Sequence, residues 1–130
     1  MMIADAQGLK KRERVSSKRT IDKLFGGTNS RSLTSYPLRL VYQDMDRVLS
    51  SDAGAQMMVS VPKRYFKRAV KRNRVKRQIR EAYRHHKSLL PDREGKTLVM
   101  AFIWMDDQLH ESEEINKKVE NLLMRVRERL

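Results

Sequence analysis

The residues of this chain best suited to chemistry are arginines and lysines gathered in one short stretch. Residues 63–87 contain twelve lysine or arginine residues and one acid, Glu81, a net charge of +11. Arginine can grip phosphate oxygens with two parallel hydrogen bonds, and lysine binds them as a point charge. So many like charges repel one another unless a partner neutralises them, so this stretch indicates a polyanion more than an ordinary solvated surface.

A second basic stretch lies near the N-terminus. Residues 10–23 hold seven lysine or arginine residues against two acids, a net charge of +5. The chain as a whole carries +13, so everything outside the two stretches sums to −3. Charge concentrated in this way is typical of a nucleic-acid-binding domain.

The residue types that perform catalysis are sparse. His85, His86 and His110 are too few and too scattered for a catalytic triad. Asp106-Asp107 has the composition of a metal-binding pair, but a role in a loop or at a helix start is favoured. There is no cysteine, which excludes disulfides, thiolate zinc sites and thiol nucleophiles. We therefore expect no catalytic residue and no metal site in the protein.

Length and composition indicate one small domain. The 130 residues are 39% apolar and 6% aromatic, which is lean but sufficient for one hydrophobic core. No apolar run is long enough to span a membrane, and residues 1–10 lack the apolar region of a secretory signal. We expect a cytoplasmic domain over residues 1–130, flexible over 1–8, with no membrane association and no obligatory protein partner.

The N-terminal half predicts one helix and two strands. Serine is a favourable N-cap, glycines end helices, and strands show a period of two. The strand that begins at Pro37 alternates, with Leu38, Leu40 and Tyr42 on one face and Arg39 and Val41 on the other. The expected elements are a helix over 18–25 capped by Ser17, a loop over 26–36, the strand from Pro37, a hairpin connection over 44–55 and a strand over 56–61.

The C-terminal half predicts two amphipathic helices around a buried strand. An apolar stripe at helical spacing defines each helix, and a continuous apolar run defines the strand. The order of elements favours an α+β sandwich in which helices cover a small sheet. The expected elements are a helix over 69–88 with a core stripe of Val75, Ile79, Ala82, Tyr83 and His86, a strand over 97–104, and a helix capped by Ser112 that packs through Ile115, Val119, Leu122, Leu123 and Val126.

The first of these helices carries a polar flank beside its apolar stripe. Side chains three and four residues apart on a helix lie about 5–6 Å from one another, so this flank suits a row of phosphates. An anionic membrane or calmodulin is a weaker partner, because the sheet needs the apolar stripe and bulky anchors are missing. No zipper follows, as a DNA-binding basic region would require. The flank consists of Asn73, Lys76, Arg77, Arg80 and Arg84.

These residues resemble a known family signature. The run Arg72-Asn73-Arg74-Val75-Lys76-Arg77 after Val59-Ser60-Val61-Pro62-Lys63-Arg64 is similar to the signature of the bacterial ribonuclease P protein subunit. The segments over residues 9–15 and 37–42 and the helix that ends at Phe25 resemble the opening of that family. The resemblance extends over about residues 9–126.

The resemblance implies a fold and a function. The fold would be α+β, a ribosomal protein S5 domain 2-like two-layer sandwich with a small mixed sheet and a left-handed βαβ crossover through the basic helix. The protein would be a subunit of the ribonuclease P ribonucleoprotein, with RNase P RNA and precursor tRNA as partners. It would assist the catalytic RNA in endonucleolytic removal of the 5′ leader, raising affinity for Mg²⁺ and substrate. The active site would lie in the RNA, which would bind most of the Mg²⁺.

Family roles can be assigned to individual positions. The resemblance implies RNA contacts at the signature residues Arg72, Asn73, Arg74, Lys76, Arg77 and Arg80. Lys63 and Arg64 match the family's basic pair after the strand. We expect further RNA contacts from the neighbouring cations Lys67, Arg68, Lys71, Arg84, Lys10, Lys11, Arg12 and Arg14. The resemblance also implies a cleft for the single-stranded leader between the first helix and the sheet, lined by Phe25, Tyr42, Ile21 and Arg39.

Two alternatives stay open at this point. Phe25 and Tyr42 are as well explained by packing in the core as by stacking on leader bases. The whole chain is also compatible with a ribosomal or other structural RNA-binding protein that has no role in cleavage. An autonomous nuclease is disfavoured, because the chain offers no convincing catalytic cluster.

Overall fold

The computed structural model describes residues 11–15, 17–27, 29–47 and 54–130. The flexibility expected of residues 1–8, the RNA contact expected of Lys10 and part of the expected hairpin connection lie outside these residues. The described elements are η1 (Lys11–Glu13), α2 (Lys18–Gly26), β1 (Arg31–Ser35), β2 (Leu38–Asp46), β3 (Ala55–Ser60), α3 (Ala69–His86), η2 (Lys87–Leu89), β4 (Lys96–Trp104) and α4 (Ser112–Arg129).

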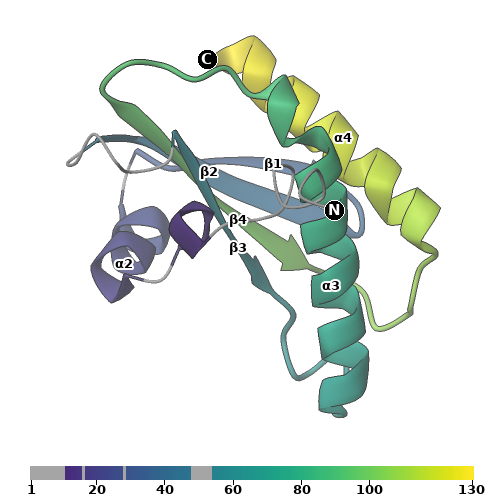
Figure 1. The fold of residues 1–130 in the computed structure, drawn as a ribbon. Helices are drawn as coiled ribbons and strands as arrows, with labels where there is room; N and C mark the ends of the chain where they lie inside the picture. Colours follow the sequence, from purple (N-terminus) through teal and green to yellow (C-terminus); the bar gives the residue numbers. More distant parts are fainter. Residues whose placement is uncertain (1–10, 16, 28, 48–53) are drawn as a thin grey trace.

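The four strands form one mixed sheet in the order β1-β2-β4-β3. β2 is antiparallel to both β1 and β4, whereas β3 runs parallel to β4. Parallel neighbours need a crossover connection, and α3 supplies it between β3 and β4. Helix α2 lies on one face of the sheet, and α3 and α4 cover the other (Figure 1). The predicted α+β fold is therefore confirmed, while the hand of the crossover stays a prediction.

Two expectations for the N-terminal half are wrong. Residues 31–35, expected in a loop, form the edge strand β1, which needs only Leu33 in the core and is otherwise polar. The segment over residues 44–55 is not a hairpin connection, because β2 extends to Asp46 and β3 does not pair with β2. The apolar strand β4 takes the central position between them, where both of its faces are covered.

Helix α2 forms as predicted and ends one residue later than expected. The Ser17 hydroxyl accepts a hydrogen bond from the backbone N–H of Thr20 at 3.4 Å, so Ser17 is the N-cap. Leu24 is fully buried and packs against Val41, Val99 and Ala101 of the sheet. This small cluster fixes α2 on its face of the sheet.

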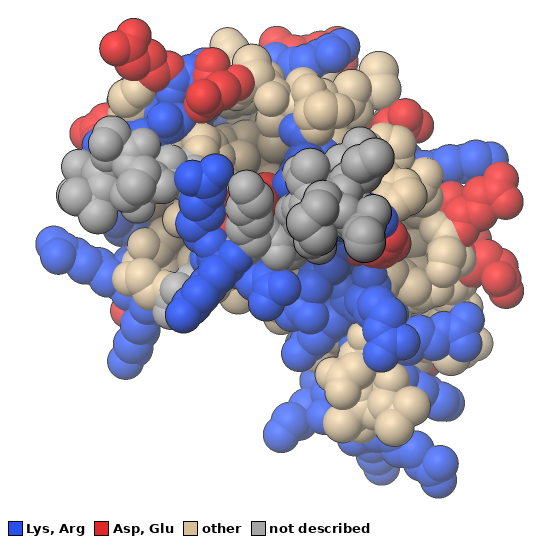
Figure 2. All heavy atoms as spheres, in the orientation of Figure 1, with Lys and Arg blue, Asp and Glu red and all other residues tan. Residues whose placement is uncertain are grey.

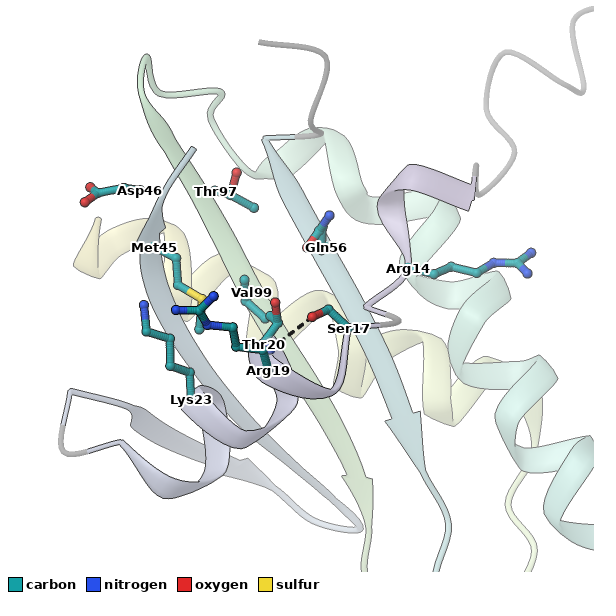
Figure 3. A pocket seen from close by; sticks show the side chains of 10 residues that line it. All are labelled: Arg14, Ser17, Arg19, Thr20, Lys23, Met45, Asp46, Gln56, Thr97 and Val99. Carbon is teal, nitrogen blue, oxygen red and sulfur yellow. Dashed lines mark hydrogen bonds between the residues drawn. The ribbon is translucent and has the colours of Figure 1, made fainter. Parts of the chain in front are cut away.

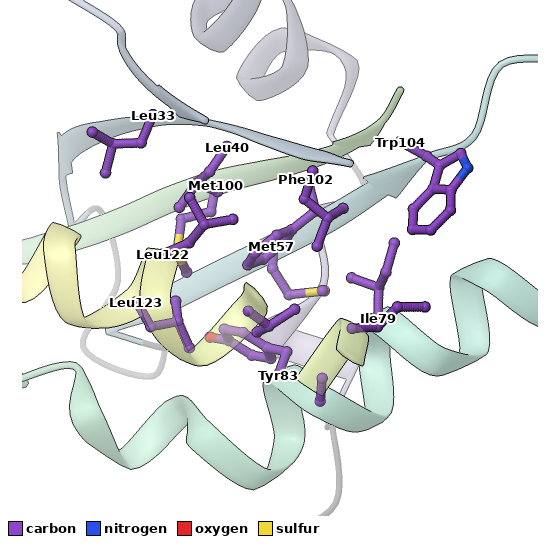
Figure 4. Close-up of a cluster of buried hydrophobic side chains, with 14 of the residues drawn as sticks. Leu33, Leu40, Met57, Ile79, Tyr83, Met100, Phe102, Trp104, Leu122 and Leu123 are labelled. Atoms are coloured by element: carbon purple, nitrogen blue, oxygen red, sulfur yellow. The ribbon is translucent and has the colours of Figure 1, made fainter. Parts of the chain in front are cut away.

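The larger core lies between the sheet and helices α3 and α4 (Figure 4). Four residues of the predicted α3 stripe are buried, whereas His86 is half-buried and faces α4 through Asn116, 3.1 Å from His86 Nε2. Helix α3 ends at His86, and its expected last residues continue into η2. All five residues of the predicted α4 face are fully buried: Ile115, Val119, Leu122, Leu123 and Val126.

The predicted cap of α4 is wrong. Ser112 is the first helical residue, and Glu111 occupies the N-cap position without a side-chain cap hydrogen bond. The Ser112 hydroxyl instead accepts a hydrogen bond from Gln78 Nε2 at 3.0 Å, and the same amide donates to the His110 backbone oxygen at 3.1 Å. Gln78 therefore ties the start of α4 to α3.

Candidate nucleic-acid interface

The two basic stretches of the sequence meet in one groove. Arg14, from the segment before α2, faces a row of side chains on the flank of α3. The backbone holds Arg14 there, because Val15 N–H donates to the Met57 carbonyl of β3 at 3.0 Å. The groove has a volume of about 440 Å³ and is lined by Arg14, Asn73, Arg77, Arg80, Glu81 and Arg84.

An ion pair fastens the N-terminal segment to the first residue of η2, directly after the end of α3. Lys87 Nζ lies 2.9 and 3.1 Å from the two carboxylate oxygens of Glu13. Both side chains are mostly buried, at 23% and 14% exposure, so solvent screens this pair less than a surface pair. Together with the Val15 backbone bond, it fixes Arg14 against the helix from both sides.

The electrostatics of the groove are strongly positive. Glu81, its one acid, lies 3.2 Å from Arg84 Nε and 3.1 Å from His85 Nε2. The hydrogen bond from Arg84 holds the pKa of Glu81 below its ordinary value, so the carboxylate stays charged and is paired. Among the residues that the structure describes, Arg77 and Arg80 have no hydrogen-bond or ion-pair partner, and both are exposed. They remain available for an anion.

Further cations surround this groove. Blue side chains gather over α3 and beyond its lower end, and red ones stand at the side where α4 begins (Figure 2). The Arg64 guanidinium lies 5.0 Å from the centroid of the Tyr65 ring. Arg72 differs from its neighbours, because its Nη1 donates to two backbone carbonyls. The exposed predicted cations are Lys11, Arg12, Lys63, Arg64, Lys67, Arg68, Lys71 and Arg74, and Lys76 is partly exposed.

A second hollow lies on the opposite side of the N-terminal segment, between α2 and the sheet (Figure 3). Arg19 and Lys23 reach into it from α2, whereas Arg14 points away from it towards α3. Its volume is about 440 Å³. The floor is formed by Met45, Gln56, Thr97 and Val99, from three strands. A cationic wall over a partly apolar floor suits a single nucleic-acid strand.

The placement of Tyr42 in a cleft beside α2 is wrong. Tyr42 is 4% exposed and belongs to the core under α3 and α4. The alternation along β2 explains this, because it puts Tyr42 on the face of Leu38 and Leu40. Val41 is the residue that faces α2. For Tyr42 the core-packing alternative therefore holds.

The other three predicted leader residues lie on or towards the α2 side of the sheet. Phe25 is 48% exposed, and Ile21 is half-buried one turn earlier on the same side of α2. Thr20 and Lys23, which line the hollow, lie on the other side of this helix. Arg39 is exposed on the α2 face of β2 and donates through Nε to the Ser32 hydroxyl at 2.9 Å.

The floor of the hollow was missed by reasoning from the sequence. The signal was present in the alternation of β2, since residues that follow Arg39 and Val41 at a spacing of two include Met45. Thr97 and Val99 follow the same rule on β4. Gln56 had no comparable signal, because its place depends on the pairing of β3 with β4.

The Asp106-Asp107 pair serves the loop before α4. Asp106 Oδ2 lies 2.6 Å from His110 Nε2, and Glu114 Oε2 lies 2.7 Å from His110 Nδ1. The hydrogen bond with His110 holds the pKa of Asp106 low. Burial opposes protonation of His110, but the two carboxylate partners outweigh it and raise the pKa of this residue. The loop role expected for the pair agrees with these contacts.

Comparison with known proteins decides the family. A family model described as Ribonuclease P matches residues 9–127. The chain belongs to the ribonuclease P protein family. Two proteins named "Ribonuclease P protein component", from two strains of Porphyromonas gingivalis, are 38% identical to it over 125 residues, or 92% of this chain and 86% of each relative. Membership of the ribonuclease P family implies a part in tRNA processing with an RNA subunit as partner.

Solved structures of ribonuclease P proteins share the fold. The protein from Thermotoga maritima superposes with a TM-score of 0.67 at 22% identity, covering 87% of this chain and 96% of that one. The protein from Staphylococcus aureus gives a TM-score of 0.62 at 20% identity, covering 92% of both chains. Among the described residues of this chain, no helix is long and apolar enough to cross a membrane.

Proposed function

We propose that this chain is the protein subunit of the ribonuclease P ribonucleoprotein, binding the catalytic RNA and helping it to remove the 5′ leader of precursor tRNA. The groove in which Arg14 joins the flank of α3 carries the proposal. There, cations from two segments far apart in sequence face one surface, and only Glu81 opposes them. We expect this work to take place in the cytoplasm and to need no further protein.

The groove is suited to the folded backbone of an RNA. Arg77 and Arg80 lie three residues apart on one rigid helix, a spacing that allows them to bind neighbouring phosphates. Asn73 offers an amide that both donates and accepts, which suits a 2′-hydroxyl or a base edge. Because α3 is anchored by its buried stripe, these groups are held in place before RNA arrives, and less conformational entropy is lost on binding.

The same surface is poorly suited to hold Mg²⁺ by itself. Magnesium prefers carboxylate and water oxygens, and the one carboxylate of the groove, on Glu81, is engaged by Arg84 and His85. The surrounding guanidinium groups repel a divalent cation. We therefore propose that the RNA binds most of the Mg²⁺ and that the protein contributes by neutralising phosphates.

Binding selectivity tests this proposal against the structural RNA-binding alternative. We expect the protein to bind a bacterial RNase P RNA more tightly than a ribosomal RNA fragment of the same length, at the same salt concentration. Fluorescence titration with both labelled RNAs measures the two dissociation constants. Equal affinity for the two RNAs would favour a general RNA-binding protein.

We further propose that the α2 face of the sheet holds the 5′ leader. Phe25 offers a half-exposed ring beside Ile21, and Arg39 brings a cation to the same side of the sheet. The hollow on the other side of α2 adds Arg19 and Lys23 above a partly apolar floor. Stacking on an aromatic ring is tolerant of sequence, which suits a leader that differs from one tRNA to another.

Phe25→Ala tests the leader proposal. Loss of one stacked base costs about 1–3 kcal/mol, so affinity for precursor tRNA should fall about 5- to 150-fold. Affinity for the same tRNA without a leader should stay the same, because Phe25 then has no base to contact. Met124→Ala, which truncates a comparably exposed apolar side chain on α4, is the control. Matched losses for both substrates would contradict the leader role.

A further inference from the structure

Arg72, the first arginine of the family signature, contacts the protein's own backbone. Its Nη1 lies 2.7 Å from the carbonyl oxygen of Phe66 and 2.8 Å from that of Lys67. Arg74, Arg77 and Arg80 differ from it, because in the described part of the chain these three have no polar partner. The signature therefore contains one arginine that is bound to the protein's own backbone and three that are available to a partner.

The two carbonyls belong to the connection between β3 and α3. This connection, residues 61–68, is anchored by Val61 and Phe66 in the core and contains one turn bond, from Tyr65 N–H to the Pro62 carbonyl at 3.1 Å. Its last residue, Arg68, is the N-cap of α3 but provides no side-chain cap hydrogen bond. The Arg72 guanidinium thus supplies the side-chain contact that ties this connection to the first turn of the helix.

The position of Arg72 along the helix supports this role. A cation in the first turns of a helix faces the positive end of the helix dipole, which is unfavourable. Two carbonyl oxygens at hydrogen-bond distance offset that cost, and they orient the guanidinium back along the chain. Four exposed cations lie on the connection that it holds: Lys63, Arg64, Lys67 and Arg68.

We propose that Arg72 is a positioning residue, which assists RNA binding by holding the 61–68 connection so that its four cations face the RNA as one unit. This inference rests on the proposed RNA-binding function. It separates Arg72 from Arg77 and Arg80, which we expect to contact phosphates directly. The alternative is that Arg72 also binds a phosphate, through its remaining N–H groups.

A double-mutant cycle distinguishes the two roles. Arg72→Ala is made in the natural chain and in a background in which Lys63, Arg64, Lys67 and Arg68 are all glutamine. We expect about a tenfold loss of affinity for a bacterial RNase P RNA in the first case and less than about a twofold further loss in the second. Arg77→Ala, the control, should cost the same in both backgrounds. An equal loss for Arg72→Ala in both backgrounds would overturn the positioning role.

A measurement without RNA keeps this test separate from the proposed function. In the free protein, amide hydrogen exchange at Tyr65, whose N–H donates to the Pro62 carbonyl, should accelerate in Arg72→Ala and stay unchanged in Arg77→Ala. Unchanged exchange in Arg72→Ala would overturn the inference whatever the RNA data show. If Arg77→Ala and the glutamine background both left RNA affinity intact, the proposed RNA-binding surface would fail instead, and the positioning of RNA contacts by Arg72 would fail with it.

Discussion

Replacing Arg77 and Arg80 together by alanine is expected to weaken binding to a bacterial RNase P RNA and to make it less sensitive to salt. Each phosphate contact that is lost should flatten the slope of log affinity against log salt by about 0.7–0.9. Two lost contacts should therefore reduce the slope by about 1.4–1.8. Affinity at low salt should fall at least about tenfold for each arginine, because hydrogen bonds to charged groups are stronger than neutral ones.

Folding does not confound this measurement, since both arginines are exposed and make no contact that the buried stripe of α3 needs. The matched control is Lys117→Ala with Arg127→Ala, which removes the same charge from exposed positions on α4, outside the groove. The control should change the slope much less. An unchanged slope in the Arg77 and Arg80 variant would show that these residues do not touch phosphates.

Trp104→Ala is expected to have the largest effect on stability. Trp104 is fully buried at the end of the inner strand β4, and its ring meets His110 edge to face with centroids 5.3 Å apart. Its indole N–H donates to the Asp106 carbonyl at 2.6 Å, so the substitution also leaves that acceptor unpaired. Truncating a buried tryptophan costs about 3–5 kcal/mol, which is a large part of the roughly 5–15 kcal/mol that stabilises a typical domain.

Equilibrium urea unfolding of the free protein measures this loss. Val70→Ala, at a position on α3 that is 78% exposed, is the control and should change the free energy of unfolding by less than about 0.5 kcal/mol. A loss below about 1 kcal/mol for Trp104→Ala would contradict the role of Trp104 as the anchor at this end of the core.

The elements with strong periodicity could be predicted from the sequence. The apolar stripes of α3 and α4 and the apolar run of β4 are local patterns. They mark the side chains that must be buried, whatever the position of the element in the fold. Strand β1 lacks such a pattern, because an edge strand with one core residue, Leu33, has the composition of a loop. The order of the strands in the sheet could not be predicted for a different reason. Local patterns do not show that β4 lies between β2 and β3, since that depends on long-range pairing.

The candidate site likewise has a part that local patterns predict and a part that depends on long-range contacts. The polar flank of α3 follows from helical periodicity alone, and the structure brings Asn73, Arg77 and Arg80 together as expected. The joining of Arg14 to that flank depends on the bond between Val15 and β3, which has no local signal. Tyr42 is instructive, because its alternation with Leu38 and Leu40 places it on the core face of β2, whereas aromatic character alone does not distinguish core packing from base stacking.

Cleavage of precursor tRNA as a function of Mg²⁺ tests the proposed function most directly. A bacterial RNase P RNA is assayed with and without the protein, and the protein is also assayed alone. We predict that the protein lowers the Mg²⁺ concentration needed for half-maximal cleavage by the RNA and that it cuts nothing by itself. An identical Mg²⁺ dependence with and without the protein would contradict its role as the assisting subunit, and cleavage by the protein alone would indicate an autonomous nuclease.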